Sequence, residues 1–173
     1  MKHLFVENLK NDTAHLKPGE FVTLTGDVIC ARDAAHKRLF ELIENNKELP
    51  FDMNGSVIYY CGPTPEKEGE VIGSCGPTTS SRMDAYTPKL MDMGLVATIG
   101  KGKRNDDVIS SIVKNKGVYF SALGGCGAIA KQHITKNEII AFEDLGCEAL
   151  RRLHFQEFPL IVAITCDGRV VFE

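Results

Sequence analysis

The chain has 173 residues, of which 43% are hydrophobic and 25% charged, and its formal net charge is −3. One hydrophobic core can form at this length. A weakly acidic chain without a long basic stripe argues against nucleic acid as the main partner. No apolar run approaches the roughly 20 residues of a membrane span, and the first residues lack the apolar region of a signal peptide. We therefore expect a cytoplasmic protein with one domain over residues 1–173.

Strand-like segments alternate with helical ones along the chain. Strands are predicted at 21–25, 56–60, 95–99, 117–122, 139–142 and 160–165. Helices are predicted from 33 to about 45, from 87 to 94 and over 106–116, because their apolar residues recur at helical spacing between capping signals. A terminal helix is expected after Gly146, and Asp167-Gly168 is expected to form a hairpin turn. The alternation predicts a single, layered α/β domain.

The first polar motif, RDAAHKR at 32–38, follows the first predicted strand and opens the first helix. We place Asp33 at the helix N-cap and Arg32 just outside it. His36 lies four residues after Arg32, a spacing that sets both over one rim. A simple cap for Asp33 and a surface position for His36 are equally good interpretations.

The second motif, GPTTSSRMD at 76–84, combines hydroxyl groups with an arginine. The proline blocks helix before it, and Thr79 and Ser80 are favourable N-caps. The free N–H groups and positive end of the helix would attract an anion, and Arg82 lies one turn further on. Ordinary capping is the alternative role for Thr78 and Thr79.

The third motif places Lys101 between two glycines directly after the predicted strand 95–99. Glycines let a ligand approach the backbone, and open α/β sheets bind ligands beyond the carboxyl ends of their strands. The motif is not a Walker A loop, because the preceding glycine is wrongly spaced and Gly102 stands where serine or threonine would hold magnesium. We interpret Lys103 and Arg104 as solvated turn residues.

The cysteines carry no metal-binding pattern. None of them forms a CxxC pair, which argues against a zinc ribbon or a ferredoxin-type cluster in this chain. Any cluster must then come from another chain. We interpret the six as free and mostly buried thiols rather than disulfides: Cys30, Cys61, Cys75, Cys126, Cys147 and Cys166.

Two other functions remain open at this point. The segment GCGAIA at 125–130 matches the GxGxxA pattern of a dinucleotide-binding module, and Asp144 lies about where an acidic residue would meet a ribose. Fewer than about fifty residues follow this pattern, however, which is short for such a fold. The other alternative is a non-catalytic scaffold that anchors a cluster-bearing subunit.

Together the motifs resemble the C-terminal domain, or β subunit, of class I (iron–sulfur) fumarases and of the similar L(+)-tartrate dehydratases. The resemblance runs nearly end to end, through RDAAHKR at 32–38, YYCGP at 59–63, GPTTSSRMD at 76–84, GKG at 100–102 and EDLG at 143–146. It implies the swivelling β/β/α type of α/β fold. It also implies a hydro-lyase that reversibly dehydrates a 2-hydroxy dicarboxylate, with malate and tartrate as open alternatives.

The resemblance further implies an active site divided between two subunits in an α₂β₂ complex. In that family a four-iron four-sulfur cluster, held by the α subunit and not by this chain, binds the substrate hydroxyl and assists its departure as a Lewis acid. This chain would supply cations for the small dicarboxylate substrate, and would be inert alone.

By motif position, the resemblance makes Thr78 the base that takes the carbon-bound proton. A threonine hydroxyl acts as a base only if nearby cations stabilise its alkoxide, and Arg82 and Lys101 are the natural stabilisers. The planar fork of arginine matches a carboxylate, whereas lysine acts as a point charge.

Substrate binding is assigned in the same way to a set of four residues: Arg32, Thr79, Arg82 and Lys101. Asp33 and His36 would lie behind them and orient Arg32. No residue of this chain is assigned as a metal ligand.

Overall fold

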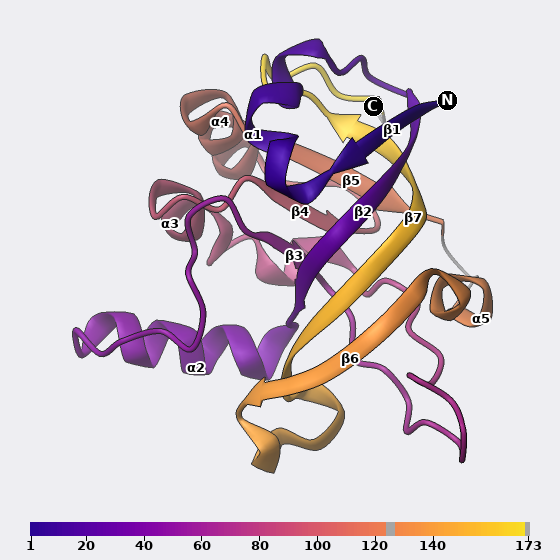
Figure 1. Cartoon of the computed structure of the whole chain (residues 1–173). Helices are drawn as coiled ribbons and strands as arrows, with labels where there is room; N and C mark the ends of the chain where they lie inside the picture. Colours follow the sequence, from indigo (N-terminus) through magenta and orange to yellow (C-terminus); the bar gives the residue numbers. More distant parts are fainter. Residues whose placement is uncertain (124–126, 172–173) are drawn as a thin grey trace.

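A computed structural model describes residues 1–123 and 127–171, and its framework is one mixed β-sheet (Figure 1). The strand order in this sheet is β1-β2-β3-β4-β5-β7-β6. The strands are β1 (Lys2–Phe5), β2 (Phe21–Cys30), β3 (Val57–Tyr59), β4 (Ala97–Gly100), β5 (Val118–Ala122), β6 (Ile134–Ala141) and β7 (Leu150–Ile164).

The last strand closes the sheet on itself. Strands β1 to β5 run parallel to their neighbours, whereas β7 runs antiparallel to β2, β5 and β6. Because β7 pairs with β2 along one part of its length and with β5 along another, β2, β3, β4, β5 and β7 form a closed ring.

Helices α2, α3 and α4 lie together on one side of this ring (Figure 1). The α-helices are α1 (Leu9–Asp12), α2 (Asp33–Glu44), α3 (Thr87–Asp92), α4 (Asp106–Asn115) and α5 (Gly127–Ala130). Short 3-10 helices complete the set: η1 (Val6–Asn8), η2 (Thr13–His15), η3 (Ser80–Met83), η4 (Lys131–His133) and η5 (Glu143–Glu148).

Two hydrophobic cores follow from the alternation of side chains along each strand. On β3, Val57 and Tyr59 face the core inside the ring, whereas Ile58 faces the core beneath the helices. Sheet therefore packs on sheet, and helices cover one outer face. The domain is α/β, as predicted, and its layers are those of the β/β/α arrangement.

Most of the predicted helices and strands are present. The helix predicted from residue 33 ends at Glu44, and the helix predicted over 106–116 ends at Asn115. The predicted turn is also present, since Gly168 has a φ of 83° and Thr165 N donates to the carbonyl oxygen of Arg169.

The terminal helix predicted after Gly146 is wrong, because this part of the chain is the long strand β7. Its buried residues include pairs three apart, Leu150 with Leu153 and Phe155 with Phe158, which mimic helical spacing. The second step of three spans Glu157, whose φ of 49° marks an irregularity in the strand. Around this irregularity, the spacing of apolar residues therefore did not distinguish a strand from a helix.

The dinucleotide-binding alternative is not supported by the topology. Two residues of its pattern, Gly125 and Cys126, lie outside the described residues. The rest forms α5, which has only four residues and leads through η4 into β6, a strand antiparallel to β7. A dinucleotide-binding unit requires a longer helix that returns to a parallel strand.

No helix among the described residues is long and apolar enough to cross a membrane.

Candidate functional site

The predicted site residues lie beyond the carboxyl ends of three neighbouring strands. Arg32 follows β2 by two residues, and Lys101 follows β4 directly. Strand β3 lies between β2 and β4, and all three are parallel, so their carboxyl ends meet at one edge. This is the edge at which open α/β sheets bind ligands.

Backbone hydrogen bonds fasten the segment that carries Thr78 to the same edge. Thr78 N donates to Tyr60 O over 2.8 Å, and Ser80 N donates to Lys101 O over 2.9 Å. Thr79 and Lys101 form an isolated parallel bridge. The second and third of the predicted motifs are thus brought into direct contact.

Gly100 makes this contact possible. A Cβ atom there would come within 1.9 Å of Ser80 Oγ and 2.9 Å of Tyr60 Cδ2. The Tyr60 ring is buried and cannot move aside. Any larger residue at position 100 would therefore push the GKG segment away from the segment that carries Ser80. The glycine before Lys101 serves close packing inside the site.

The helix predicted to begin at Thr79 is a single 3-10 helix, η3, of four residues. Thr79 precedes it in an extended conformation, and its side chain makes no capping hydrogen bond. The helix expected after this motif is therefore only a single short turn, which sums few peptide dipoles. Positive charge comes from side chains instead, including Arg82, whose side chain is 51% exposed.

Asp33 links the two predicted arginines. Its Oδ1 lies 3.0 Å from Arg82 Nε, and its Oδ2 lies 3.6 Å from Arg32 Nε. The N-cap of α2 is Arg32 rather than Asp33, which is the first residue of the helix. Asp33 therefore does not cap the helix, and its carboxylate is free to pair with both guanidinium groups.

Arg32 has a second acidic partner that the sequence reasoning missed. Glu148 Oε1 lies 3.2 Å from Arg32 Nε and accepts a hydrogen bond of 3.2 Å from Ala34 N. The stem of Arg32 lies across Gly62, where a Cβ atom would come within 2.8 Å of both Cδ and Nη1. The only sequence signal for Glu148 is its place just after the EDLG motif.

His36 is buried, so the surface interpretation is wrong. Its Nδ1 donates to Arg32 O over 2.8 Å, and its ring lies 5.5 Å from the rings of both Tyr60 and Tyr86. Burial lowers the pKa of His36 to about 4. The imidazole is therefore neutral at ordinary pH, and it contacts the backbone of Arg32 rather than its side chain.

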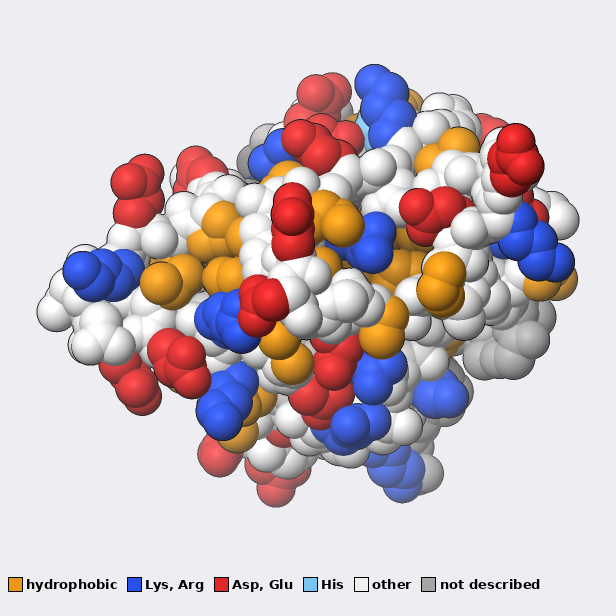
Figure 2. Space-filling model, turned by 90° about the horizontal axis from the view of Figure 1, so that it is seen from below, with side chains coloured by type: hydrophobic (Ala, Val, Ile, Leu, Met, Phe, Trp, Pro, Cys, Tyr) orange, Lys and Arg blue, Asp and Glu red, His pale blue; other side chains and the backbone are white. Residues whose placement is uncertain are grey.

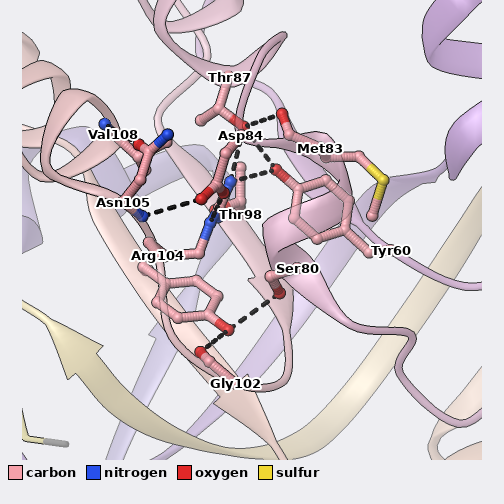
Figure 3. A network of polar contacts seen from close by, with 11 residues as sticks. Tyr60, Ser80, Met83, Asp84, Thr87, Thr98, Gly102, Arg104, Asn105 and Val108 are labelled. Atoms are coloured by element: carbon pink, nitrogen blue, oxygen red, sulfur yellow. Dashed lines mark hydrogen bonds and ion pairs between the residues drawn. The ribbon is translucent and has the colours of Figure 1, made fainter.

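Arg104 is also buried, which corrects its interpretation as a solvated turn residue. Its Nε donates to Asp84 Oδ1 over 2.6 Å. Its terminal nitrogens donate to the hydroxyl groups of Thr98, Thr87 and Tyr60, at 2.9, 2.7 and 3.2 Å (Figure 3). The guanidinium also lies against two aromatic rings. A buried charge that is fully paired in this way is structural.

This network reaches the site through Tyr119. The Tyr119 hydroxyl lies 2.9 Å from Ser80 Oγ and 2.9 Å from Gly102 O, and its ring centroid lies 5.0 Å from Arg104 Cζ. Burial raises the pKa of Tyr119 to about 12. Ser80 and Gly102, the neighbours of Thr79 and Lys101, are therefore held by neutral hydroxyl groups and one buried cation (Figure 3).

The charges on the face seen from below in Figure 1 are mixed. Figure 2 shows basic, acidic and hydrophobic side chains interspersed there, without an extended region of one sign. The pairs that Asp33 makes with Arg32 and Arg82 agree with this pattern. Positive charge at the site is partly compensated by the protein itself.

The described cysteines are free, as predicted, and three of them cluster in the core. Cys30 Sγ donates to Cys61 O over 3.0 Å, and contacts with the Cys30 and Cys75 thiols raise the pKa of the Cys61 thiol. Cys126 lies outside the described residues. Over residues 1–123 and 127–171, no group of three or more His, Cys, Asp or Glu is arranged to hold a metal ion. These residues do not fit an iron–sulfur cluster.

Fold and site together define an α/β domain with an edge of paired cations beyond three strand ends. Comparison with known proteins places this domain in a family. The family model described as Fumarase C-terminus matches residues 2–173. The chain belongs to the fumarase C-terminal family, as its motifs predicted.

Its relatives include separate β subunits and parts of longer enzymes. It is 35% identical over its whole length to a protein of Methanocaldococcus jannaschii named as a candidate β subunit of L(+)-tartrate dehydratase, and covers 92% of that protein. It is 31% identical, over 97% of its length, to the L(+)-tartrate dehydratase subunit beta of Escherichia coli, and covers 85% of it. Over 88% of its length it is 37% identical to the anaerobic class I fumarate hydratase of Escherichia coli, of which it spans 28%.

Proposed function

We propose that this chain is the β subunit of an iron–sulfur-dependent hydro-lyase. The reaction is the reversible dehydration of a 2-hydroxy dicarboxylate, either malate to fumarate or L-tartrate to oxaloacetate. One observation carries this proposal: Arg32, Arg82 and Lys101 gather at one sheet edge, in a chain whose relatives are named fumarate hydratases and tartrate dehydratase β subunits.

The arginines and the lysine have separate tasks in this proposal. Arg32 binds one substrate carboxylate through its planar fork. Removal of a proton beside a carboxylate moves negative charge onto that group, and donors already in place stabilise the charge. Arg82 and Lys101 are assigned to this developing charge, and Thr79 adds a hydroxyl contact at the bridge to Lys101.

Thr78 is assigned as the base for the carbon-bound proton. Its backbone is fixed by the hydrogen bond to Tyr60 O, and its side chain is partly exposed at the same edge as Lys101. Nearby cations stabilise the alkoxide that this role requires. Asp33 and His36 support Arg32, the former by its ion pair and the latter through the backbone.

We assign the four-iron four-sulfur cluster to a separate α subunit, because the described residues of this chain do not fit it. Two copies of each subunit would form the complex. The paired cations at the edge of this chain would then face the partner. The scaffold alternative shares the partner but assigns no role to the cations.

An anaerobic turnover assay tests the proposal. Malate, fumarate and L-tartrate are offered to this chain alone and to the chain reconstituted with the cluster-bearing α subunit. We expect turnover only in the mixture. Arg32→Ala, Arg82→Ala and Lys101→Ala should each lower kcat/KM about a hundredfold or more, since each removes a charged donor. Lys103→Ala removes a lysine two residues from Lys101 and should leave kcat/KM within about twofold.

The same assay separates the alternatives. Wild-type turnover by all three cation variants would support the scaffold and reject the proposed half-site. Thr78→Ser keeps a hydroxyl and should retain more activity than Thr78→Ala. Equal loss in these two variants would argue against Thr78 as the base.

A further inference from the structure

The 3-10 helix η5 is fastened to the first half of α2 by side chains. Both terminal nitrogens of Arg38 donate to Asp144, at 2.7 and 2.8 Å, in a bidentate pair. The Arg38 guanidinium also lies 5.3 Å from the centre of the Phe142 ring. Figure 1 shows this segment between β6 and β7, below the beginning of α2. The last residue of η5, Glu148, therefore has a defined place beside α2.

One oxygen of Glu148 makes two contacts there. Oε1 accepts from Ala34 N and lies 3.2 Å from Arg32 Nε, although 114 residues separate Ala34 from Glu148 in sequence. Ala34 N belongs to the first turn of α2, where backbone donors lack partners within the helix. Arg32 itself makes no side-chain capping bond. Glu148 thus satisfies the helix end and holds the Arg32 side chain at the same time.

The other carboxylate near Arg32 cannot do this alone. Asp33 approaches Arg32 Nε to 3.6 Å but approaches Arg82 Nε to 3.0 Å, so its shorter contact is with Arg82. The Glu148 side chain is 24% exposed and the Arg32 side chain 28%, which limits screening of their pair by solvent. Without Glu148, the longer contact to Asp33 would be the one acidic contact left to Arg32 among the described residues, and we expect the guanidinium to be held less firmly.

We infer that Glu148 is a positioning residue that aims the Arg32 guanidinium at a substrate carboxylate. The inference rests on the proposed function, in which Arg32 binds that carboxylate. Glu148 makes its closest approach at Nε, on one side of the guanidinium. The terminal nitrogens are then the donors that a carboxylate meets as a fork.

Steady-state kinetics of the reconstituted complex test this inference. Glu148→Gln keeps an oxygen that can accept from Ala34 N but removes the negative charge beside Arg32. We expect KM for the turned-over dicarboxylate to rise about tenfold while kcat changes less than about threefold, because a substrate-binding contact is lost in ground state and transition state alike. The matched control is Glu138→Gln, which removes the same charge from an exposed pair with Arg152 and should change neither constant.

A double-mutant cycle shows whether Glu148 acts through Arg32. Glu148→Gln should lower kcat/KM about tenfold in the wild-type background but less than about twofold in the Arg32→Ala background. An equal loss in both backgrounds would overturn the inference, because it would indicate a general structural effect. If Glu148→Gln does not fold, Glu148→Asp replaces it in the test. The shorter side chain keeps the negative charge but moves the carboxylate away from Arg32. An unchanged KM in this variant would overturn the inference.

The cycle also separates this inference from the proposed function. Full activity of Arg32→Ala would reject the role of Arg32, and the role of Glu148 with it. A large loss in Arg32→Ala with wild-type kinetics in Glu148→Gln would reject only the positioning role of Glu148.

Discussion

His36 shows how burial decides the charge of a single residue at this site. The residue lies four positions after Arg32, and from spacing alone it was a plausible exposed partner. In the structure its Nδ1 donates to Arg32 O, so its Nε2 carries no proton in the neutral form. Nε2 has no hydrogen-bond partner among the described residues. Protonation would bury an unpaired donor and a charge together, which opposes the charged form.

The depressed pKa of His36 predicts a pH-dependent stability. Its pKa is about 4 in the folded protein and 6.5 in the unfolded chain. Between these values the unfolded state binds the proton and the folded state does not, so the free energy of unfolding falls as pH falls from about 6.5 to 4. The full effect is on the order of 3 kcal/mol. Urea unfolding of the wild-type chain and of His36→Gln, measured from pH 4.5 to 7.5, checks this.

The informative quantity is the difference between the two proteins at each pH. The wild-type advantage should be largest near pH 7 and should shrink toward pH 4.5. A difference that stays constant over this range would show that His36 does not titrate with a lowered pKa.

The residues proposed for the site all stand in short sequence motifs. Arg32 and Lys101 were singled out because each follows a predicted strand, and Thr78 and Arg82 because they lie in the GPTTSSRMD motif. Glu148 could not, since its contact with Ala34 spans 114 residues. Long-range pairing leaves no spacing signal in a single sequence.

The prediction that Arg104 is a solvated turn residue was wrong for a different reason. A lysine- and arginine-bearing turn is normally solvated, and nothing local distinguishes Arg104 from Lys103. Only the folded chain brings Asp84, Thr87 and Thr98 around its guanidinium. Charge type was visible in the sequence, but burial was not.

At the scale of elements, the hydrogen bonds of Asp84 and Arg104 connect the end of η3 with α3, β4 and the start of α4. Asp84 Oδ1 accepts from Arg104 Nε, and Oδ2 accepts from Asn105 N at the start of α4. Asn105 in turn caps α4, with its side chain accepting from Val108 N. The pair therefore fixes where α4 begins relative to the end of η3 (Figure 3).

Asp84→Asn should destabilise the domain strongly. Loss of one partner of a buried ion pair leaves the other charge uncompensated, which costs about 3–5 kcal/mol. The Arg104 side chain is fully buried and that of Asp84 is 8% exposed, so solvent cannot compensate. Guanidinium unfolding measures the loss. The control is Asp92→Asn in the exposed pair with Lys114, which should leave the free energy of unfolding almost unchanged.

Equal stability of the Asp84→Asn and Asp92→Asn variants would contradict this account of the network. Arg104→Lys offers a second comparison. Lysine keeps the charge but cannot donate to three hydroxyl groups and a carboxylate at once. It should therefore also destabilise the domain.

The elements with regular patterns were predicted well, and the irregular strand was not. Helix α4 has an unbroken apolar stripe with a capping asparagine, so its period is clear. Strand β7 contacts β2, β5 and β6 in turn, and its register with β5 shifts between Tyr119 and Phe120. Each shift breaks the two-residue alternation on which a strand prediction depends.

At the scale of the whole molecule, ring closure by β7 positions the candidate site. The strand ends that carry Arg32 and Lys101 belong to β2 and β4, both members of the ring. Strands β3 and β4 have paired neighbours on both sides, and because β7 pairs with both β2 and β5, these two strands have them as well. The site edge is thus built on the part of the sheet that has no free edges.

This architecture predicts a hierarchy of amide hydrogen exchange. Amides of β7 that pair with β2 and β5 should exchange only on global unfolding, because they lie in the ring and beside the inner core. Amides of β6 should exchange at least about tenfold faster by local opening, since among the described strands β6 pairs only with β7, and Ile134 is its one buried residue. Native-state exchange at increasing urea measures both. Equal rates and equal urea dependence in β6 and β7 would show that the ring is not the most stable unit of the fold.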